Sequence, residues 1–252
     1  MGKRGSRTNS GVRAAPLYRA FRASDEIEAW GEQGWGDWLR GLERKEARAL
    51  TAYTRNEYEF VNEMLRREMF TSTDPDIYVD PAFRETVQLL DQALARGPVP
   101  ENVTVYRGMR IPRVYDMIRD GTLLIGQRMF DRAYISTSLS QTLAKGFANS
   151  SLPNLAHGTH RILVTIDVPA GSAGGYVQKL SRGSAEPEHE LLLPRDCRFV
   201  VKGYEMMVDE DWPDSPPMAH LKLEVVPEST RAEKSSLYPP NWTGDSEDGG
   251  WG

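Results

Sequence analysis

Two glutamates, Glu188 and Glu190, are separated by one residue just before an apolar run at 191–193. In an extended backbone side chains alternate between faces, so this spacing predicts two carboxylates on one face, about 6–7 Å apart along the strand, with His189 on the other. Like charges this close repel, and one carboxylate should hold its proton above the usual pKa. A lone Glu-x-Glu is also common at the solvated tip of a strand, so the pair alone does not define a site.

Two further motifs lie upstream. Arg107 and Gly108 end a short alternating segment; an arginine there offers a planar, permanently charged group suited to a diphosphate, and a glycine lets a ligand approach the backbone. Ser136, Thr137 and Ser138 end a second β-prone segment with hydroxyls that can bind a ligand or cap the next helix. Each motif is ambiguous alone, but the order Arg, Ser-Thr-Ser, Glu-x-Glu is specific.

In this order the motifs resemble the arginine–serine–glutamate group of mono-ADP-ribosyltransferases, which includes the clostridial binary-toxin enzymes and related exoenzymes. The resemblance covers roughly residues 50–207, and the segment from Tyr53 to Arg66 is similar to the family's first NAD-facing helix. It implies an α+β ADP-ribosyltransferase fold, with a helical N-terminal part packed on a strand-rich mixed β core. It also implies transfer of ADP-ribose from NAD to a protein arginine with release of nicotinamide.

The resemblance assigns roles to the motif residues. Arg107 would bind the NAD phosphates, and Gly108 would hold the nicotinamide amide through its backbone. Ser136 would orient the catalytic glutamate and the nicotinamide ribose. Glu190 would be the catalytic glutamate, and Glu188 the carboxylate on the acceptor side.

On the helix, the resemblance implies that Arg66 is a second diphosphate contact and that Tyr58 and Asn62 also bind NAD. Tyrosine and asparagine at this spacing can equally be buried packing residues. The stretch from Gly174 to Ser181 looks like the start of the family's acceptor-recognition loop. The family often has an aromatic residue in that loop, and none occurs at 182–187.

The reaction itself explains why two carboxylates are useful. Nicotinamide leaves NAD as a neutral molecule and needs no general acid, but the ribose left behind resembles an oxocarbenium ion, as in glycoside hydrolysis. One carboxylate can stabilise that positive charge. The other can take a proton from an arginine acceptor, whose guanidinium is protonated and a poor nucleophile without a base.

The composition excludes several other classes. The 252 residues suffice for one large domain or for a domain with extensions, and the net charge of −5 gives no case for nucleic-acid binding. The single cysteine, Cys197, cannot form an internal disulfide and is expected to be a buried packing residue. The four histidines have no metal-ligand spacing, and no Rossmann or P-loop fingerprint occurs. The resemblance implies NAD as a substrate, and the histidine spacing predicts no metal.

The ends of the chain differ from its middle. Residues 1–23 form a basic arm that we expect to be disordered, 24–227 the ADP-ribosyltransferase domain, and 228–252 a disordered polar tail. No apolar stretch approaches the ~20 residues of a membrane span, and no secretory signal follows the basic start. We expect action in the cytoplasm of a host or target cell, no membrane partner, and a target protein with an accessible arginine. A delivery partner or an immunity protein is compatible with this.

The hydrophobic pattern predicts helices first and strands later. A capping-box pattern, 54–57, predicts a helix start, and Asp80 and Pro81 predict another, with Phe83, Val87, Leu90 and Leu94 facing inward. Alternation at 162–168 predicts a strand, followed by strands at 191–193, 199–207 and 221–226. A short helix is expected at 140–147.

Two other functions stay open from the sequence. An NAD glycohydrolase, in which water takes the ribose, would use the same site. A non-catalytic module, such as a minor phage head component that keeps the fold, is disfavoured by intact Arg107, Ser136 and Glu190. The sequence also fits either a bacterial toxin or effector or a phage-encoded enzyme that modifies its host.

Overall fold

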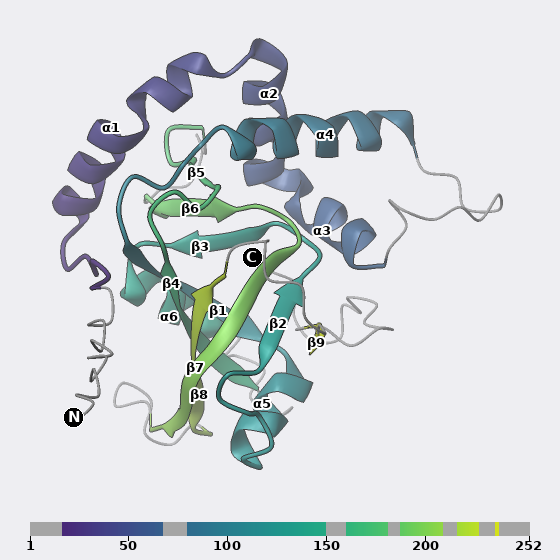
Figure 1. Cartoon of the computed structure of the whole chain (residues 1–252). Coiled ribbons are helices and arrows are strands. Elements are labelled where there is room, and N and C mark those ends of the chain that lie inside the picture. Colours follow the sequence, from purple (N-terminus) through teal and green to yellow (C-terminus); the bar gives the residue numbers. More distant parts are fainter. Residues whose placement is uncertain are drawn as a thin grey trace, which may run out of the picture.

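The computed structural model of the chain describes residues 17–67, 80–149, 160–180, 187–208, 216–226 and 235–236. In this part of the chain, helices cover a mixed nine-stranded sheet (Figure 1), which confirms the predicted α+β class. The helices are α1 (Ser24–Gly41), α2 (Arg44–Ala52), η1 (Tyr53–Glu57, π-helical), α3 (Tyr58–Arg66), α4 (Pro81–Ala95), α5 (Pro112–Arg119) and α6 (Gln141–Asn149). The strands are β1 (Val103–Arg110), β2 (Arg128–Asp131), β3 (Ile135–Ser138), β4 (Arg161–Val168), β5 (Gly175–Tyr176), β6 (Glu190–Leu193), β7 (Cys197–Met207), β8 (Met218–Val225) and β9 (Ser235–Ser236).

The order of the strands brings the three sequence motifs together. The sheet runs β5-β6-β3-β1-β4-β8-β7-β2-β9, antiparallel except at β4–β8 and β2–β9. Ser138 of β3 lies opposite Tyr106 of β1 on one side and opposite Glu190 of β6 on the other. Segments that are far apart in the chain thus meet at one place in the sheet, because β3 pairs with both β1 and β6.

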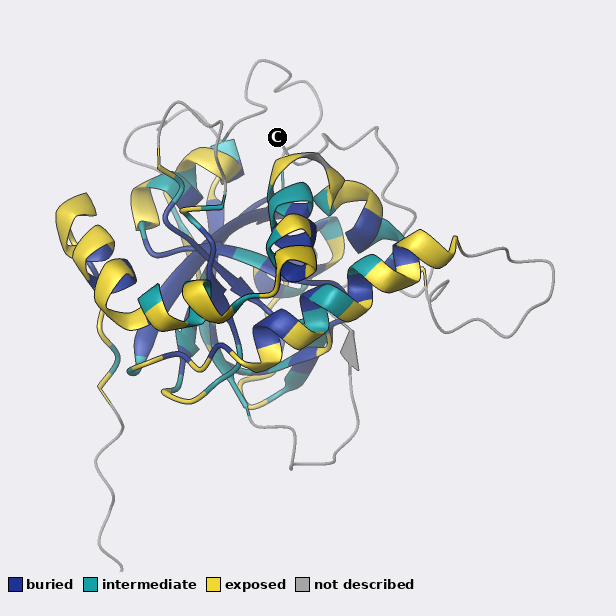
Figure 2. Ribbon diagram, turned by 90° about the horizontal axis from the view of Figure 1, so that it is seen from above, coloured by how far each residue is buried: buried dark blue, intermediate teal, exposed yellow. Residues whose placement is uncertain are grey.

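The N-terminal helices form a layer over the β5, β6 and β3 end of the sheet (Figure 1). Their buried sides face inward and their exposed sides face outward (Figure 2). A core cluster joins Leu50 of α2 and Val87 of α4 to Leu192 of β6. Since side chains alternate along a strand, Glu190 lies on the same helix-covered face as Leu192. Helix α6 packs against β1 and β4, and α5 against β7 and β8.

One predicted helix start is confirmed and another is wrong. The Asp80 side chain accepts a hydrogen bond from the Ala82 N–H, and Pro81 opens α4. At 54–57 no helix begins, because α2 continues through the π-helical turn into α3. The backbone donors there are already inside a helix, and the Thr54 hydroxyl bonds to the Thr51 carbonyl instead of capping.

Part of each predicted tail lies among the described residues and contacts the sheet. Residues 17–23 belong to the arm expected to be disordered, yet Arg19 bridges to Val103 of β1 and Phe21 is buried. The Tyr18 hydroxyl also donates to Glu224 of β8. In the predicted C-terminal tail, β9 pairs with β2. The rest of both tails lies outside the described residues.

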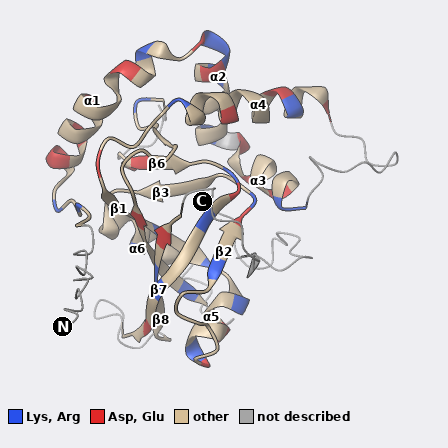
Figure 3. Cartoon of the chain, viewed as in Figure 1, with Lys and Arg blue, Asp and Glu red and all other residues tan. Residues whose placement is uncertain are grey.

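Both signs of charge are spread over the helices and the sheet edges, without a face of one sign on the side shown (Figure 3). Among the described helices, none combines the length and the apolar character that crossing a membrane requires.

Gly108 of β1 is needed for the packing of α6. A Cβ at this position would lie 2.1 Å from the Ala144 carbonyl oxygen and 2.4 Å from the Ala148 nitrogen, both backbone atoms of α6. Gly108→Ala should therefore lower the free energy of unfolding by about 1–3 kcal/mol or more, because the helix must move. Gly146→Ala on α6 is the control, since its Cβ would meet nothing within 4 Å. It should raise stability by about 0.5–1 kcal/mol. Denaturant unfolding measures both, and equal stability of the two variants would contradict this packing.

Candidate active site

The motifs are joined by two short hydrogen bonds. The Ser136 hydroxyl donates to Glu190 Oε1 at 2.6 Å. The Arg107 guanidinium donates through Nη1 to the Ser136 carbonyl oxygen, also at 2.6 Å. The predicted link between Ser136 and Glu190 is therefore present, and Arg107 lies beside it.

Glu190 is almost completely buried, with 5% of its surface exposed. Burial is the largest cause that raises the pKa of its carboxyl to about 7; the Ser136 hydrogen bond lowers that pKa, the charge of Glu188 raises it, and Arg107 lowers it. From the usual 4.5, this shift corresponds to roughly 3 kcal/mol disfavouring the charged form. Because the folded pKa is raised, the group stabilises the fold below its unfolded pKa, and that contribution is lost as the pH rises through about 7.

Glu188 does not lie on the same strand, so the predicted extended Glu-x-Glu is wrong. Strand β6 begins at Glu190, and His189 before it has a left-handed backbone with φ 52°. The carbonyl of Glu188 accepts a hydrogen bond from the Ser138 hydroxyl at 2.8 Å. Its half-buried carboxyl has a raised pKa because of burial. A carboxyl group with a raised pKa is present, as expected. For Glu190 the main cause of the raised pKa is burial rather than repulsion between the two glutamates.

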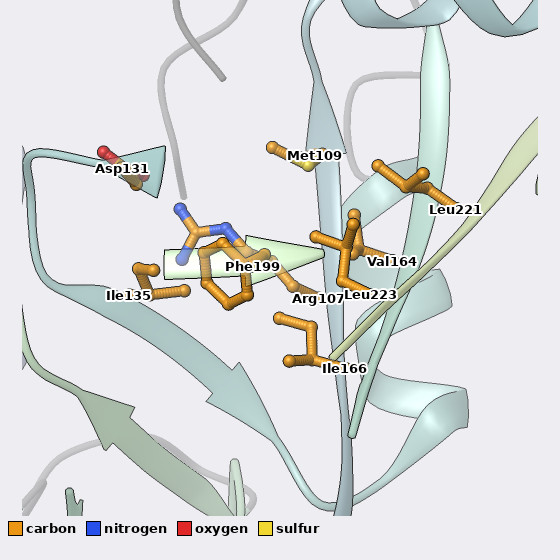
Figure 4. Close-up of a pocket in the computed structure, with 9 residues that line it drawn as sticks. All are labelled: Arg107, Met109, Asp131, Ile135, Val164, Ile166, Phe199, Leu221 and Leu223. Atoms are coloured by element: carbon orange, nitrogen blue, oxygen red, sulfur yellow. The ribbon is translucent and has the colours of Figure 1, made fainter. Parts of the chain in front are cut away.

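The side chain of Arg107 lies in a small, mostly apolar pocket between parts of the sheet. It extends from β1 past Phe199 towards Ile135 and Asp131 (Figure 4). The pocket has a volume of about 10 Å³, about the room that one water needs. The hydrogen bond to the Ser136 carbonyl and these apolar neighbours place the Arg107 guanidinium beside Ser136.

Arg66 reaches the same region but is bound to Asp131. Its Nε and Nη2 donate to the two carboxylate oxygens of Asp131 at 3.2 and 3.0 Å. Both side chains are at most 6% exposed. Removing one partner of such a buried pair costs about 3–5 kcal/mol. Sequence reasoning missed Asp131, and the contact of Arg66 with a diphosphate stays a prediction.

Asn62 is buried and bonded to Tyr53, a residue for which the sequence analysis predicts no individual role in the site. The Asn62 amide donates to the Tyr53 hydroxyl at 3.0 Å. In a plain α-helix these residues, nine apart, would lie about two and a half turns from each other on opposite sides. The π-helical segment η1 lies between α2 and α3, so the chain from Tyr53 to Asn62 is not one regular α-helix. The pKa of Tyr53 is raised by burial and by the charge of Glu190.

Tyr58 lies at the edge of this site. Its hydroxyl donates to Glu59 at 3.2 Å. Burial raises the pKa of Tyr58 to about 12, and the charges of Glu59, Glu188 and Glu190 raise it too. A role of Tyr58 and of the Gly108 backbone in binding NAD stays a prediction.

Within the described part of the chain, no group of three or more His, Cys, Asp or Glu residues could hold a metal ion. Cys197 is buried, and burial raises the pKa of its thiol to about 12. The loop that the sequence predicts for acceptor recognition falls mostly in 181–186, outside the described residues.

Known proteins resemble this chain in both sequence and fold. The family model of the ADP-ribosyltransferase exoenzymes matches residues 27–223. The mono-ADP-ribosyltransferase C3 of Clostridium botulinum D phage is 25% identical over 76% of this chain and 75% of its own length. The NAD(+)–arginine ADP-ribosyltransferase EFV of Enterococcus faecalis is 24% identical over 70% of this chain, but the match spans only 33% of that protein. The crystal structure of the C3 exoenzyme of Clostridium limosum has a TM-score of 0.61 at 22% identity, and the match covers 84% of this chain and 98% of that one.

The fold is that of the ADP-ribosyltransferases, the class of enzyme that takes ADP-ribose from NAD. The chain belongs to the ADP-ribosyltransferase exoenzyme family.

Ser136 should set the pH at which Glu190 becomes active. Its hydrogen bond lowers the pKa of that carboxyl, so Ser136→Ala should move the rising limb of kcat/KM for NAD from about 7 to higher pH. Nicotinamide release measured from about pH 5.5 to about pH 9, which brackets that pKa, reports the midpoint. Ser138→Ala is the control, because that hydroxyl bonds to the Glu188 carbonyl and not to a carboxylate. A midpoint that moves down, or moves equally in both variants, would contradict the assignment.

Proposed function

We propose that this chain transfers ADP-ribose from NAD to an arginine side chain of a target protein and releases nicotinamide. One observation carries the proposal: a buried Glu190, held by Ser136 beside Arg107, has a second carboxylate, Glu188, two residues away. Glu190, Ser136 and Arg107 are suited to act on NAD, and the Glu188 carboxylate is suited to act on the acceptor.

In the first step the bond between nicotinamide and ribose breaks. Nicotinamide leaves as a neutral molecule, and positive charge develops on the ribose. The Glu190 carboxylate can accept a hydrogen bond from a ribose hydroxyl and stabilise that charge, while Arg107 offers its guanidinium to the diphosphate. The low polarity that makes Glu190 costly to ionise also strengthens its effect on a nearby positive charge.

In the second step an arginine of the target attacks the ribose. A guanidinium is protonated at physiological pH, so one proton must be removed as the new N–C bond forms. Glu188 is suited to accept it, because burial raises the pKa of its carboxyl while part of the residue stays accessible. The proton then resides on Glu188, and the charges balance.

The choice of arginine as acceptor is supported by the name of the Enterococcus faecalis relative, an NAD(+)–arginine ADP-ribosyltransferase. The names of the botulinum phage relatives give no acceptor. We further propose that the target lies in the cytoplasm of a host or target cell. A delivery partner or an immunity protein would be consistent with such a role.

The two glutamates should have separable functions. Glu188→Gln should suppress arginine modification by about 100-fold, the usual range for a lost general base, yet spare most NAD hydrolysis. Water needs less activation than a guanidinium once the ribose cation has formed. The assay is incubation with adenine-labelled NAD and agmatine or cell lysate, with mass spectrometry of the modified residue.

Glu85→Gln, which alters an exposed ion pair with Lys45 on the helical layer, is the matched control and should change neither rate. Adducts on Asn, Thr or Cys would contradict the arginine acceptor. Equal loss of transfer and hydrolysis in Glu188→Gln would contradict the division of labour. Hydrolysis of NAD by the unaltered chain without any protein adduct would favour a glycohydrolase.

A further inference from the structure

His189, between the two glutamates, has a backbone conformation that a residue with a Cβ seldom adopts. Its φ is 52°, and in the described part of the chain only Asp196, with φ 57°, is another non-glycine residue of this kind. Such a conformation is unfavourable by itself and persists where the surroundings fix it. Strand β6 starts at the next residue, so this turn sets the direction in which Glu188 leaves the strand.

Three separate elements hold His189 in this conformation. Its N–H donates to the Gln178 side chain at 2.7 Å, and its carbonyl accepts from the Leu139 N–H at 3.0 Å. The ring Nε2 lies 3.0 Å from the Ser24 hydroxyl at the start of α1. The residue is 1% exposed, so the ring fills space between α1 and the catalytic strand.

Ser24 also departs from its usual behaviour. A serine at the start of a helix commonly caps the free N–H groups of the first turn. Helix α1 has Ala23 as its N-cap and no side-chain cap, and the Ser24 hydroxyl reaches His189 instead. The contact between α1 and the Glu-x-Glu segment is thus made by a hydroxyl in the first turn of the helix and by the ring of a residue with a left-handed backbone.

We propose that His189 is a positioning residue for transfer to the acceptor: its buried ring, bound to α1, fixes the left-handed turn that presents Glu188 beside Glu190. The inference rests on the proposed function, in which Glu188 activates the arginine. Glu190 depends less on the ring, because β3 and β5 hold its strand on both sides. His189 should therefore affect the acceptor step and leave the binding of NAD unchanged.

The experiment compares His189→Ala with His189→Asn. His189→Ala should lower kcat for agmatine modification about 10-fold or more, as small displacements of reacting groups do. The KM for NAD and the rate of NAD hydrolysis should stay within about threefold, because the variant keeps the interactions that bind NAD in both the ground state and the transition state. His189→Asn should regain part of the transfer, because asparagine tolerates the left-handed conformation better than alanine but does not replace the ring that contacts Ser24. A residue that only fills space would be impaired equally by both changes, since neither restores the ring.

Two more variants separate the contact with the ring from a general effect on stability. Ser24→Ala removes only the hydrogen bond to the ring and should reduce transfer relative to hydrolysis, in the same direction but less than His189→Ala. Asp196→Ala changes the other left-handed residue, in the turn between β6 and β7, and should lower the melting temperature without changing the ratio of transfer to hydrolysis.

Transfer at the unaltered rate in His189→Ala, or equal losses in His189→Ala and His189→Asn, would overturn the role of His189. An unaltered chain that hydrolyses NAD but leaves agmatine unmodified would instead overturn the proposed function. The two failures are distinguishable because the unaltered chain is measured in the same assay.

Discussion

The burial of the Glu190 carboxyl is the constraint on which the site depends. Ionising this group inside the protein is costly, and burial raises its pKa to about 7. The Ser136 hydroxyl and the Arg107 guanidinium offset part of that cost, and both come from neighbouring strands of the sheet. The strand register therefore places Ser136 and Arg107 where they offset the cost of ionising Glu190. A shifted register would leave the Glu190 carboxyl in the core without these partners.

The helical layer also shapes the surroundings of the Glu190 carboxyl. The Tyr53 hydroxyl and the Asn62 amide are hydrogen-bonded across the π-helical segment, and burial and the charge of Glu190 raise the pKa of Tyr53. Helix α1 contacts the Glu-x-Glu segment through Ser24 and His189. The helices thus exclude water from the carboxylate and hold its surroundings still, which is what electrostatic preorganisation requires.

Local sequence patterns predicted much of this arrangement, and their failures have physical reasons. The resemblance carried by Arg107, Ser136 and Glu190 pointed to residues that the structure brings together, because their strands β1, β3 and β6 pair side by side. The extended Glu-x-Glu failed because the left-handed turn at His189 is held by tertiary contacts that alternation cannot reveal. The capping box at 54–57 failed because a π-helical turn keeps the backbone donors occupied. The Asp131 partner of Arg66 had no local signal, since it comes from a strand 65 positions further along the chain.

We infer that Glu190 acts on the charge that develops as nicotinamide leaves, and not on the binding of NAD. The Glu190→Gln variant tests this, with NAD affinity measured by calorimetry and nicotinamide release measured in the same preparation. We expect an affinity within a few-fold of the unaltered chain and a release rate lower by about 10²–10³, the usual effect of losing one electrostatic contact to a transition state. Release at the unaltered rate would contradict it, as would a loss of rate explained entirely by a loss of affinity.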